Sequence, residues 1–256
     1  MWSRYEKEQG MERGCGQWEV PWPCTEILKT LAELNEQCLE LLTEQALHLP
    51  AAQMPSHTAQ HPLPPAHMSS HTAQLPSHRA QIPAPASIPM LDESRDLWRR
   101  LDADSRRRAA ACPYLLVDAG FADPYRWRWV STHRVGDREP AFAPFFCVPG
   151  LMRVAHQVFN NAWYIARADP AAAPLFLGMP APCVALLRAC TLRQLTELGE
   201  RHASWLRPRW TGRPRVWREL LSAAIANDAR ALERARLHGV QLLATELRAL
   251  AYDYVK

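Results

Sequence analysis

Residues 34–39, Leu34-Asn35-Glu36-Gln37-Cys38-Leu39, begin a series of three short motifs that occurs twice in this chain. The first copy continues with Leu97-Trp98 and Ala111–Gly120, and the second consists of Phe159–Tyr164, Leu175-Phe176 and Ala189–Gly199. The spacing also agrees, because Trp98 to Cys112 and Phe176 to Cys190 both span 14 residues. Repetition of this kind indicates related structural units. The sequence therefore predicts two related modules.

Both modules carry the apolar spacing of amphipathic helices. Apolar residues recur every three or four positions in residues 21–48, opposite a row of acidic side chains, and again in residues 150–167. Thr191 and Gln194 form a Thr-x-x-Gln capping box, which predicts the start of another helix. A last stripe over residues 232–250 completes the helical pattern.

Few segments favour any structure other than helix. Helices are expected at residues 91–100 and 104–118, and short extended pieces at most at residues 127–131 and 204–210. The predicted class is all-α. We expect the two modules to pack against each other as a fused pseudo-dimer.

Composition divides the chain into six segments. The linker is rich in Pro, His, Ala, Gln and Ser and contains three near copies of one phrase, so we expect it to be disordered. Its histidines lack fixed spacing, and no metal or cofactor is expected. The segments are an N-terminal tail (1–20), the first helix (21–48), the linker (49–90), the rest of module 1 (91–135), a connector (136–149) and module 2 (150–256).

Charge divides at the linker. Residues 1–90 hold 5 Lys+Arg against 9 Asp+Glu, whereas residues 91–256 hold 25 against 17. A basic half favours a polyanionic partner, although charge bears on association and not on fold. Nearly all the cations are arginines, which suit phosphate and guanine edges, but a GC-rich genome gives the same bias.

The cysteine and hydropathy patterns exclude several cellular locations and several kinds of site. The seven cysteines include no Cys-x-x-Cys, which argues against a zinc ribbon and a secreted disulfide scaffold. No early apolar segment or run of 18 apolar residues appears, so the expected location is the cytoplasm. No nucleophile, phosphate loop or paired base accompanies Asp118 and Asp123, and no enzyme activity is expected.

The ordered motifs of module 2 resemble the FlhD-type flagellar transcriptional activator family over roughly residues 151–250. The resemblance rests on Phe159-Asn160-x-x-Trp163-Tyr164, Leu175–Met179, Leu187–Leu195 and Leu237–Leu243. It implies a small, helical, dimer-forming bacterial regulator that binds promoter DNA together with a FlhC-type subunit. The family member is a single module of about half this length, whereas here a degenerate first copy in residues 25–130 precedes it.

Arginines clustered in module 2 are the candidate DNA contacts. Closely spaced guanidinium groups neutralise phosphates, and the interleaved Trp205, Trp210 and Trp217 could stack on bases or close the module's core. Residues 180–201 also fit a helix-turn-helix, or two packed helices with a solvated charged face. The candidates are Arg193, Arg201, Arg207, Arg209, Arg213, Arg215 and Arg218.

The last apolar stripe is the candidate surface for self-association or a partner, because its spacing of three and four suits helix pairing. Its residues are Leu232, Val240, Leu243, Leu247 and Leu250. Two functions follow from the sequence. The first is a DNA-associated transcriptional regulator that acts with a FlhC-type partner, and the alternative is a protein-interaction adaptor that has kept the fold without DNA binding.

Overall fold

The computed structural model describes residues 22–48, 88–132 and 144–253. In the first half, the elements are α1 (Trp22–His48), α2 (Pro89–Asp92), α3 (Arg95–Arg100), α4 (Ala103–Ala110), strand β1 (Val117–Asp118) and α5 (Pro124–Thr132). The second half holds α6 (Leu151–Ala168), α7 (Ala173–Leu177), α8 (Ala181–Ala189), α9 (Leu192–Arg201), the 3-10 helix η1 (Ala203–Trp205), strand β2 (Arg207–Pro208), α10 (Pro214–Ile225) and α11 (Ala229–Asp253). The predicted all-α class is confirmed.

Local capping sets several of these boundaries. The Asp102 side chain accepts a hydrogen bond from the Ser105 backbone N–H at 2.7 Å, and so caps α4. The capping box expected at Thr191 and Gln194 is confirmed, because each side chain bonds the other's backbone N–H. α10 begins with Pro214, a residue suited to the first helical turn.

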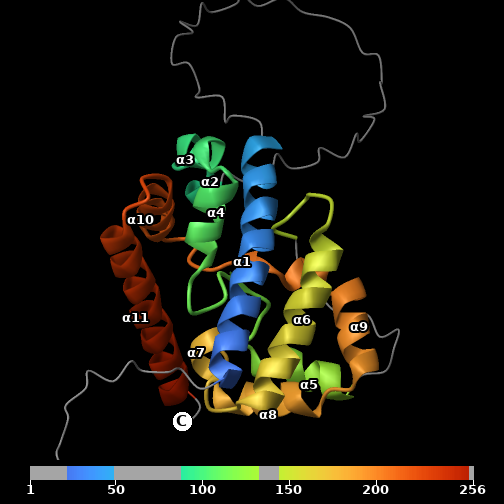
Figure 1. The fold of residues 1–256 in the computed structure, drawn as a ribbon. Coiled ribbons are helices and arrows are strands. Elements are labelled where there is room, and N and C mark those ends of the chain that lie inside the picture. Colours follow the sequence, from blue (N-terminus) through green and yellow to red (C-terminus); the bar gives the residue numbers. More distant parts are fainter. Residues whose placement is uncertain (1–21, 49–87, 133–143, 254–256) are drawn as a thin grey trace, which may run out of the picture.

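Two long helices, one from each module, lie at the centre of the molecule. α1 and α6 lie side by side and run in opposite directions, while α4 packs on α1 and α9 packs on α6 (Figure 1). The fully buried Asn35 of α1 donates to the carbonyl oxygens of Ala110 (3.1 Å) and Tyr114 (2.9 Å) and accepts from the Leu116 N–H (2.8 Å). One side chain thus fixes the chain between α4 and β1 against the central helix.

Each half of the chain packs one of its helices against the other half. α5 of the first half packs on α8 of the second, and α10 of the second half packs on α2, α3 and α4 of the first. β1 and β2 pair antiparallel between them, with Val117 opposite Pro208 and Asp118 opposite Arg207. This exchange is what a fused pair of modules would give; the pseudo-dimer itself stays a prediction.

α5 and α10 also share a local design. Each begins with a proline and buries a tryptophan three residues later, Trp127 and Trp217. The Trp127 indole N–H donates to the Gly120 carbonyl at 3.1 Å, and that of Trp217 donates to the Arg209 carbonyl at 2.8 Å. Both indoles therefore tie their helix to the loop that precedes it.

The order of elements agrees with the register that the sequence motifs suggest for the repeat. Cys112 follows α4, and Cys190 directly follows α8. Trp98 lies in α3, the helix before α4, and Phe176 lies in α7, the helix before α8. The paired strands and the buried tryptophans that follow them continue this correspondence, because they share contacts as well as residue type. That the two modules are related stays a prediction.

Several expected elements differ in detail. Residues 91–100 are divided between α2 and α3, the helix expected at 104–118 ends at Ala110, and residues 127–131 lie in α5 instead of an extended piece. The predicted linker lies almost entirely outside the described residues. Among the helices that the structure describes, none combines the length and apolar character needed to cross a membrane.

Candidate interaction surfaces

The arginine segment is divided among three elements. Arg193 and Arg201 are exposed on α9, Arg207 and Arg209 belong to β2 and the residue after it, and Arg213, Arg215 and Arg218 lie at the start of α10. α9 and α10 stand on opposite sides of the molecule (Figure 1). The structure therefore does not bring the seven predicted residues together as one phosphate-binding surface.

Arg209 is a structural residue. It is 7% exposed, its Nε–H donates to the Leu115 carbonyl at 2.8 Å, and a second N–H donates to the Leu177 carbonyl. Burial lowers the pKa of its guanidinium, which the nearby carboxylates of Asp118 and Glu246 oppose. With its N–H groups bonded to backbone carbonyls and its side chain buried, Arg209 is not placed as the exposed DNA contact that the sequence predicted.

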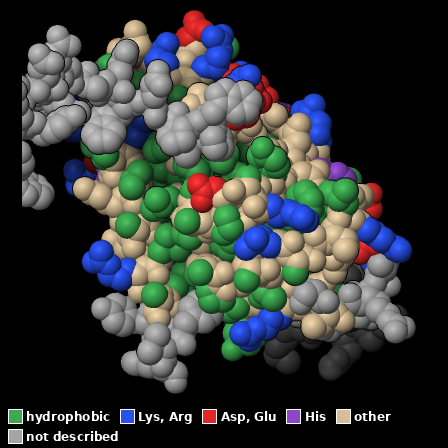
Figure 2. All heavy atoms as spheres, turned by 60° about the horizontal axis from the view of Figure 1, so that its bottom comes forward, with side chains coloured by type: hydrophobic (Ala, Val, Ile, Leu, Met, Phe, Trp, Pro, Cys, Tyr) green, Lys and Arg blue, Asp and Glu red, His purple; other side chains and the backbone are tan. Residues whose placement is uncertain are grey.

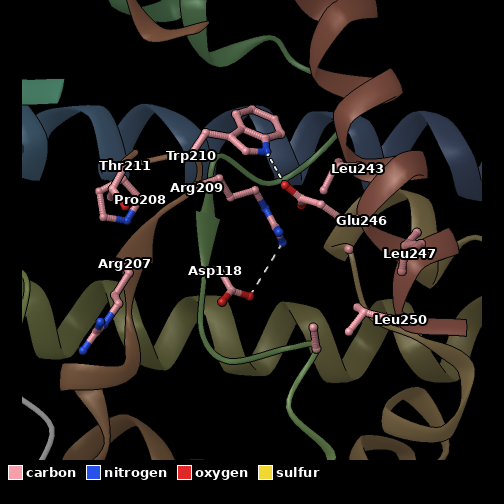
Figure 3. A pocket seen from close by; sticks show the side chains of 12 residues that line it. Asp118, Arg207, Pro208, Arg209, Trp210, Thr211, Leu243, Glu246, Leu247 and Leu250 are labelled. Carbon is pink, nitrogen blue, oxygen red and sulfur yellow. Dashed lines mark hydrogen bonds and ion pairs between the residues drawn. The ribbon is translucent and has the colours of Figure 1, made fainter. Parts of the chain in front are cut away.

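The space around Arg209 depends on a glycine. Gly178 ends α7 in the left-handed region with φ +62°, and a Cβ there would lie 2.8 Å from one guanidinium nitrogen of Arg209. A pocket of about 240 Å³ remains beside these groups (Figure 3). In it Arg209 points toward Asp118, 4.0 Å away, and Arg207 points away from both.

Three of the remaining arginines pair with glutamates. Arg193 lies 3.5 Å from Glu197, Arg215 donates to Glu219 at 2.8 Å, and Arg218 donates to the Glu93 backbone carbonyl at 2.9 Å. The hydrogen bond from Arg215 lowers the pKa of Glu219. Exposed pairs of this kind contribute only about 0–1 kcal/mol. These arginines stay accessible to a ligand, but their charge is partly balanced.

The interleaved tryptophans form part of the core. Trp205 and Trp217 are 1% exposed, and the half-buried Trp210 donates its indole N–H to Glu246 at 3.0 Å. Buried rings cannot stack on bases. Of the two readings of these tryptophans, closure of the core is therefore the one that the structure supports.

The α11 stripe mainly fixes α11 to its own chain. Leu232 and Leu243 are buried, whereas Val240, Leu247 and Leu250 are half-buried. Val240 lines a groove of about 450 Å³ between α1 and α11, and the other two half-buried leucines line the pocket beside Arg209. The stripe thus has no continuous exposed face.

An apolar surface over α7 and α8 was missed by the sequence analysis. Residues 170–187 carry no charged, hydroxyl or amide side chain, and five of the eighteen are proline or glycine. Six of them are exposed nevertheless: Pro170, Ala171, Leu175, Ala181, Pro182 and Ala185. We call this the α7–α8 surface. Figure 2 shows apolar side chains across the face on which α8 lies.

The signal for this surface was present in the sequence. The run of residues without polar side chains is visible there, but proline and glycine interrupt its helical period. Without a clear helical period, the sequence does not show whether such an apolar segment is buried or exposed. Only the contacts of α8 with α5, α6 and α7 show which of its faces is left uncovered.

Two arginines stand at the border of the α7–α8 surface. Arg188 is exposed in the last turn of α8, and Arg167 is exposed at the end of α6. Arg167 lies 4.7 Å above the Trp163 ring, whose N–H donates to the Cys190 carbonyl at 3.0 Å, just past α8. Both guanidinium groups therefore lie at the same end of α8.

Within the part of the chain that the structure describes, most of the cysteines are buried and the metal-ligating side chains are scattered. Burial raises the pKa of the Cys112 and Cys190 thiols to about 11, which disfavours the reactive thiolate. Among the described residues, no group of three or more His, Cys, Asp or Glu side chains is placed to hold a metal ion.

No protein-family model, curated protein or solved structure matches this chain. The functional argument therefore rests on the surfaces described above.

Proposed function

We propose that this protein is a non-enzymatic interaction adaptor, and that the α7–α8 surface binds its partner. The observation that carries the proposal is the exposure of Leu175, at 54%, within a segment that has no polar side chain. Contiguous apolar surface of this kind is uncommon on a monomer and marks sites of protein association. Covering it stabilises a complex by removing apolar area from water.

A second candidate, a DNA-associated transcriptional regulator acting with a FlhC-type subunit, is favoured by one observation. Arg213, Arg215 and Arg218 lie exposed within the first turns of α10, and Arg213 precedes its proline. Exposed guanidinium groups on one helix end are suited to phosphates. The pairing of Arg215 with Glu219 and of Arg218 with Glu93 weakens this candidate, because those bonds compete with phosphate.

A titration distinguishes the two functions. Fluorescence anisotropy of mixed-sequence duplex DNA with the full chain at about 50 and 200 mM salt measures phosphate contact, since such binding weakens steeply with salt. The adaptor function predicts weak binding that Arg213→Glu with Arg215→Glu leaves nearly unchanged. Tight, salt-dependent binding that this double variant abolishes would establish the regulator instead.

The adaptor function has its own positive test. An amphipathic helical peptide should bind the full chain, and Leu175→Glu should abolish that binding by placing a charge in the apolar contact. Leu237→Glu is the matched control, because Leu237 is 53% exposed on α11. Equal effects of the two variants, or no binding of any apolar peptide, would remove the basis for the adaptor.

A further inference from the structure

We infer that the partner of the α7–α8 surface is an amphipathic helix whose apolar face is bordered by acidic residues. This inference rests on the proposed adaptor function and specifies the chemistry of the partner. It is drawn from the shape of the apolar surface, from the charge at its border and from the occupants that the same features disfavour.

The apolar part of the surface suits a helix. The outward side chains of α8 are small, with Ala181, Pro182 and Ala185 exposed, while Leu175 of α7 projects beside them. Helix axes approach to about 8–10 Å, and the shorter distance requires small side chains at the contact. A partner helix can therefore lie along α8 and cover Leu175 with its own larger apolar residues.

The border of the surface is positive. Arg188 and Arg167 are both exposed there, at the end of α8 marked by Cys190. The neighbouring Asp169 does not offset them fully, because its carboxylate accepts the backbone N–H groups of Ala171 and Ala172 at 3.1 and 3.0 Å. Carboxylates on the partner would pair with the two guanidinium groups and set the direction of the bound helix.

The same charges disfavour a second copy of this chain. In a two-fold contact with the two α8 helices parallel, Arg188 and Arg167 would meet the same arginines of the other copy. With the helices antiparallel, these arginines would face the other end of the surface, where residues 170–187 offer no carboxylate. The first arrangement adds repulsion that selects against self-pairing, and the second gives the guanidinium groups no partner.

A lipid bilayer is also a poorer occupant. Helices that lie on membranes insert Trp, Phe and Leu side chains into the acyl region. Of the six exposed residues of the α7–α8 surface, Leu175 alone carries a large apolar side chain, at 54% exposure. Small side chains favour close packing against a protein over insertion.

The test uses three designed helical peptides and the full chain. The peptides share one apolar face, whose border is Glu in the first and Lys in the second, and the third has the composition of the first in shuffled order. We expect the Glu-bordered peptide to bind about tenfold more tightly than the Lys-bordered one at low salt, since each exposed pair contributes modestly. The preference should shrink as salt rises.

Variants of the chain test whether the α7–α8 surface causes the preference for the Glu-bordered peptide. Arg167→Glu with Arg188→Glu should reverse the order of the two peptides, and Leu175→Glu or Ala185→Glu should abolish both affinities. Leu237→Glu should change neither. Circular dichroism establishes that each variant is folded, and Leu175→Ala, which adds no charge, serves as a milder second variant that should weaken both peptides.

The outcomes separate this inference from the adaptor function. If both bordered peptides bind equally and both are lost in Leu175→Glu, the adaptor stands and the acidic partner is overturned. If no peptide binds and Leu175→Glu has no effect, both are overturned. Binding to anionic vesicles in place of peptides, or Leu175-dependent self-association of the chain, would replace the helix with a membrane or a second copy.

Discussion

Gly239 allows α11 to lie against the fully buried Tyr114. A Cβ built at Gly239 would lie 1.9 Å from the Tyr114 hydroxyl oxygen and 2.3 Å from its Cζ, far inside van der Waals contact. The ring cannot easily retreat, because it is 1% exposed and packs edge-on against Trp210 at 5.7 Å between centroids. In Gly239→Ala, α11 must therefore move away from the body of the protein.

Two effects oppose each other in this variant. Alanine favours a helix interior over glycine by about 0.5–1 kcal/mol, whereas overpacking a dense core costs about 1–3 kcal/mol. Because the clash involves a ring held on several sides, overpacking prevails, and we expect a loss of about 1–2 kcal/mol. For a domain of this size, that loss lowers the Tm by roughly 2–8 °C.

Thermal and urea unfolding followed by circular dichroism measure the effect. Gly212→Ala is the matched control, since a Cβ there meets no atom within 4 Å, and we expect little change. Tyr114→Ala should suppress the effect of Gly239→Ala in the double variant, because the two sites are in contact. If Gly239→Ala is as stable as Gly212→Ala, the reasoning about α11 is refuted.

Three further predictions concern buried polar groups. Asn35→Leu should lower the free energy of unfolding by about 2–5 kcal/mol in urea titrations, because buried backbone groups lose their partners; an unchanged midpoint would contradict this role. Arg209→Met should cost about 2–4 kcal/mol by orphaning the carbonyls of Leu115 and Leu177, and the same variant should leave DNA affinity unchanged. Burial lowers the pKa of His202 below its ordinary 6.5, so the folded state favours the neutral ring; stability is complete above pH 6.5 and declines as the pH falls below it. Urea midpoints at pH 7.5 and 5.5 should therefore differ less in His202→Gln than in the wild type, and an equal difference would count against this cause.

The candidate site was only partly predictable from the sequence. Arg193, Arg201 and Arg215 are exposed, as phosphate contacts must be, but Arg209 from the same cluster is buried. Charge density along the chain cannot distinguish these cases, because the carbonyls that bind Arg209 belong to Leu115 and Leu177, far away in sequence. The α7–α8 surface was missed for a related reason, since the sequence does not show which apolar residues other segments cover and which stay exposed.

The sequence by itself determined the features that depend on neighbouring residues. The all-α class, the long helix ending at His48 and the capping box at Thr191 follow from apolar period and local hydrogen bonding. Only the tertiary structure decided that residues 117–118 form a strand, because their partners Pro208 and Arg207 lie in the other half of the chain. It also decided which arginine is buried and which apolar face stays open, since burial depends on contacts between segments that the order of residues does not specify.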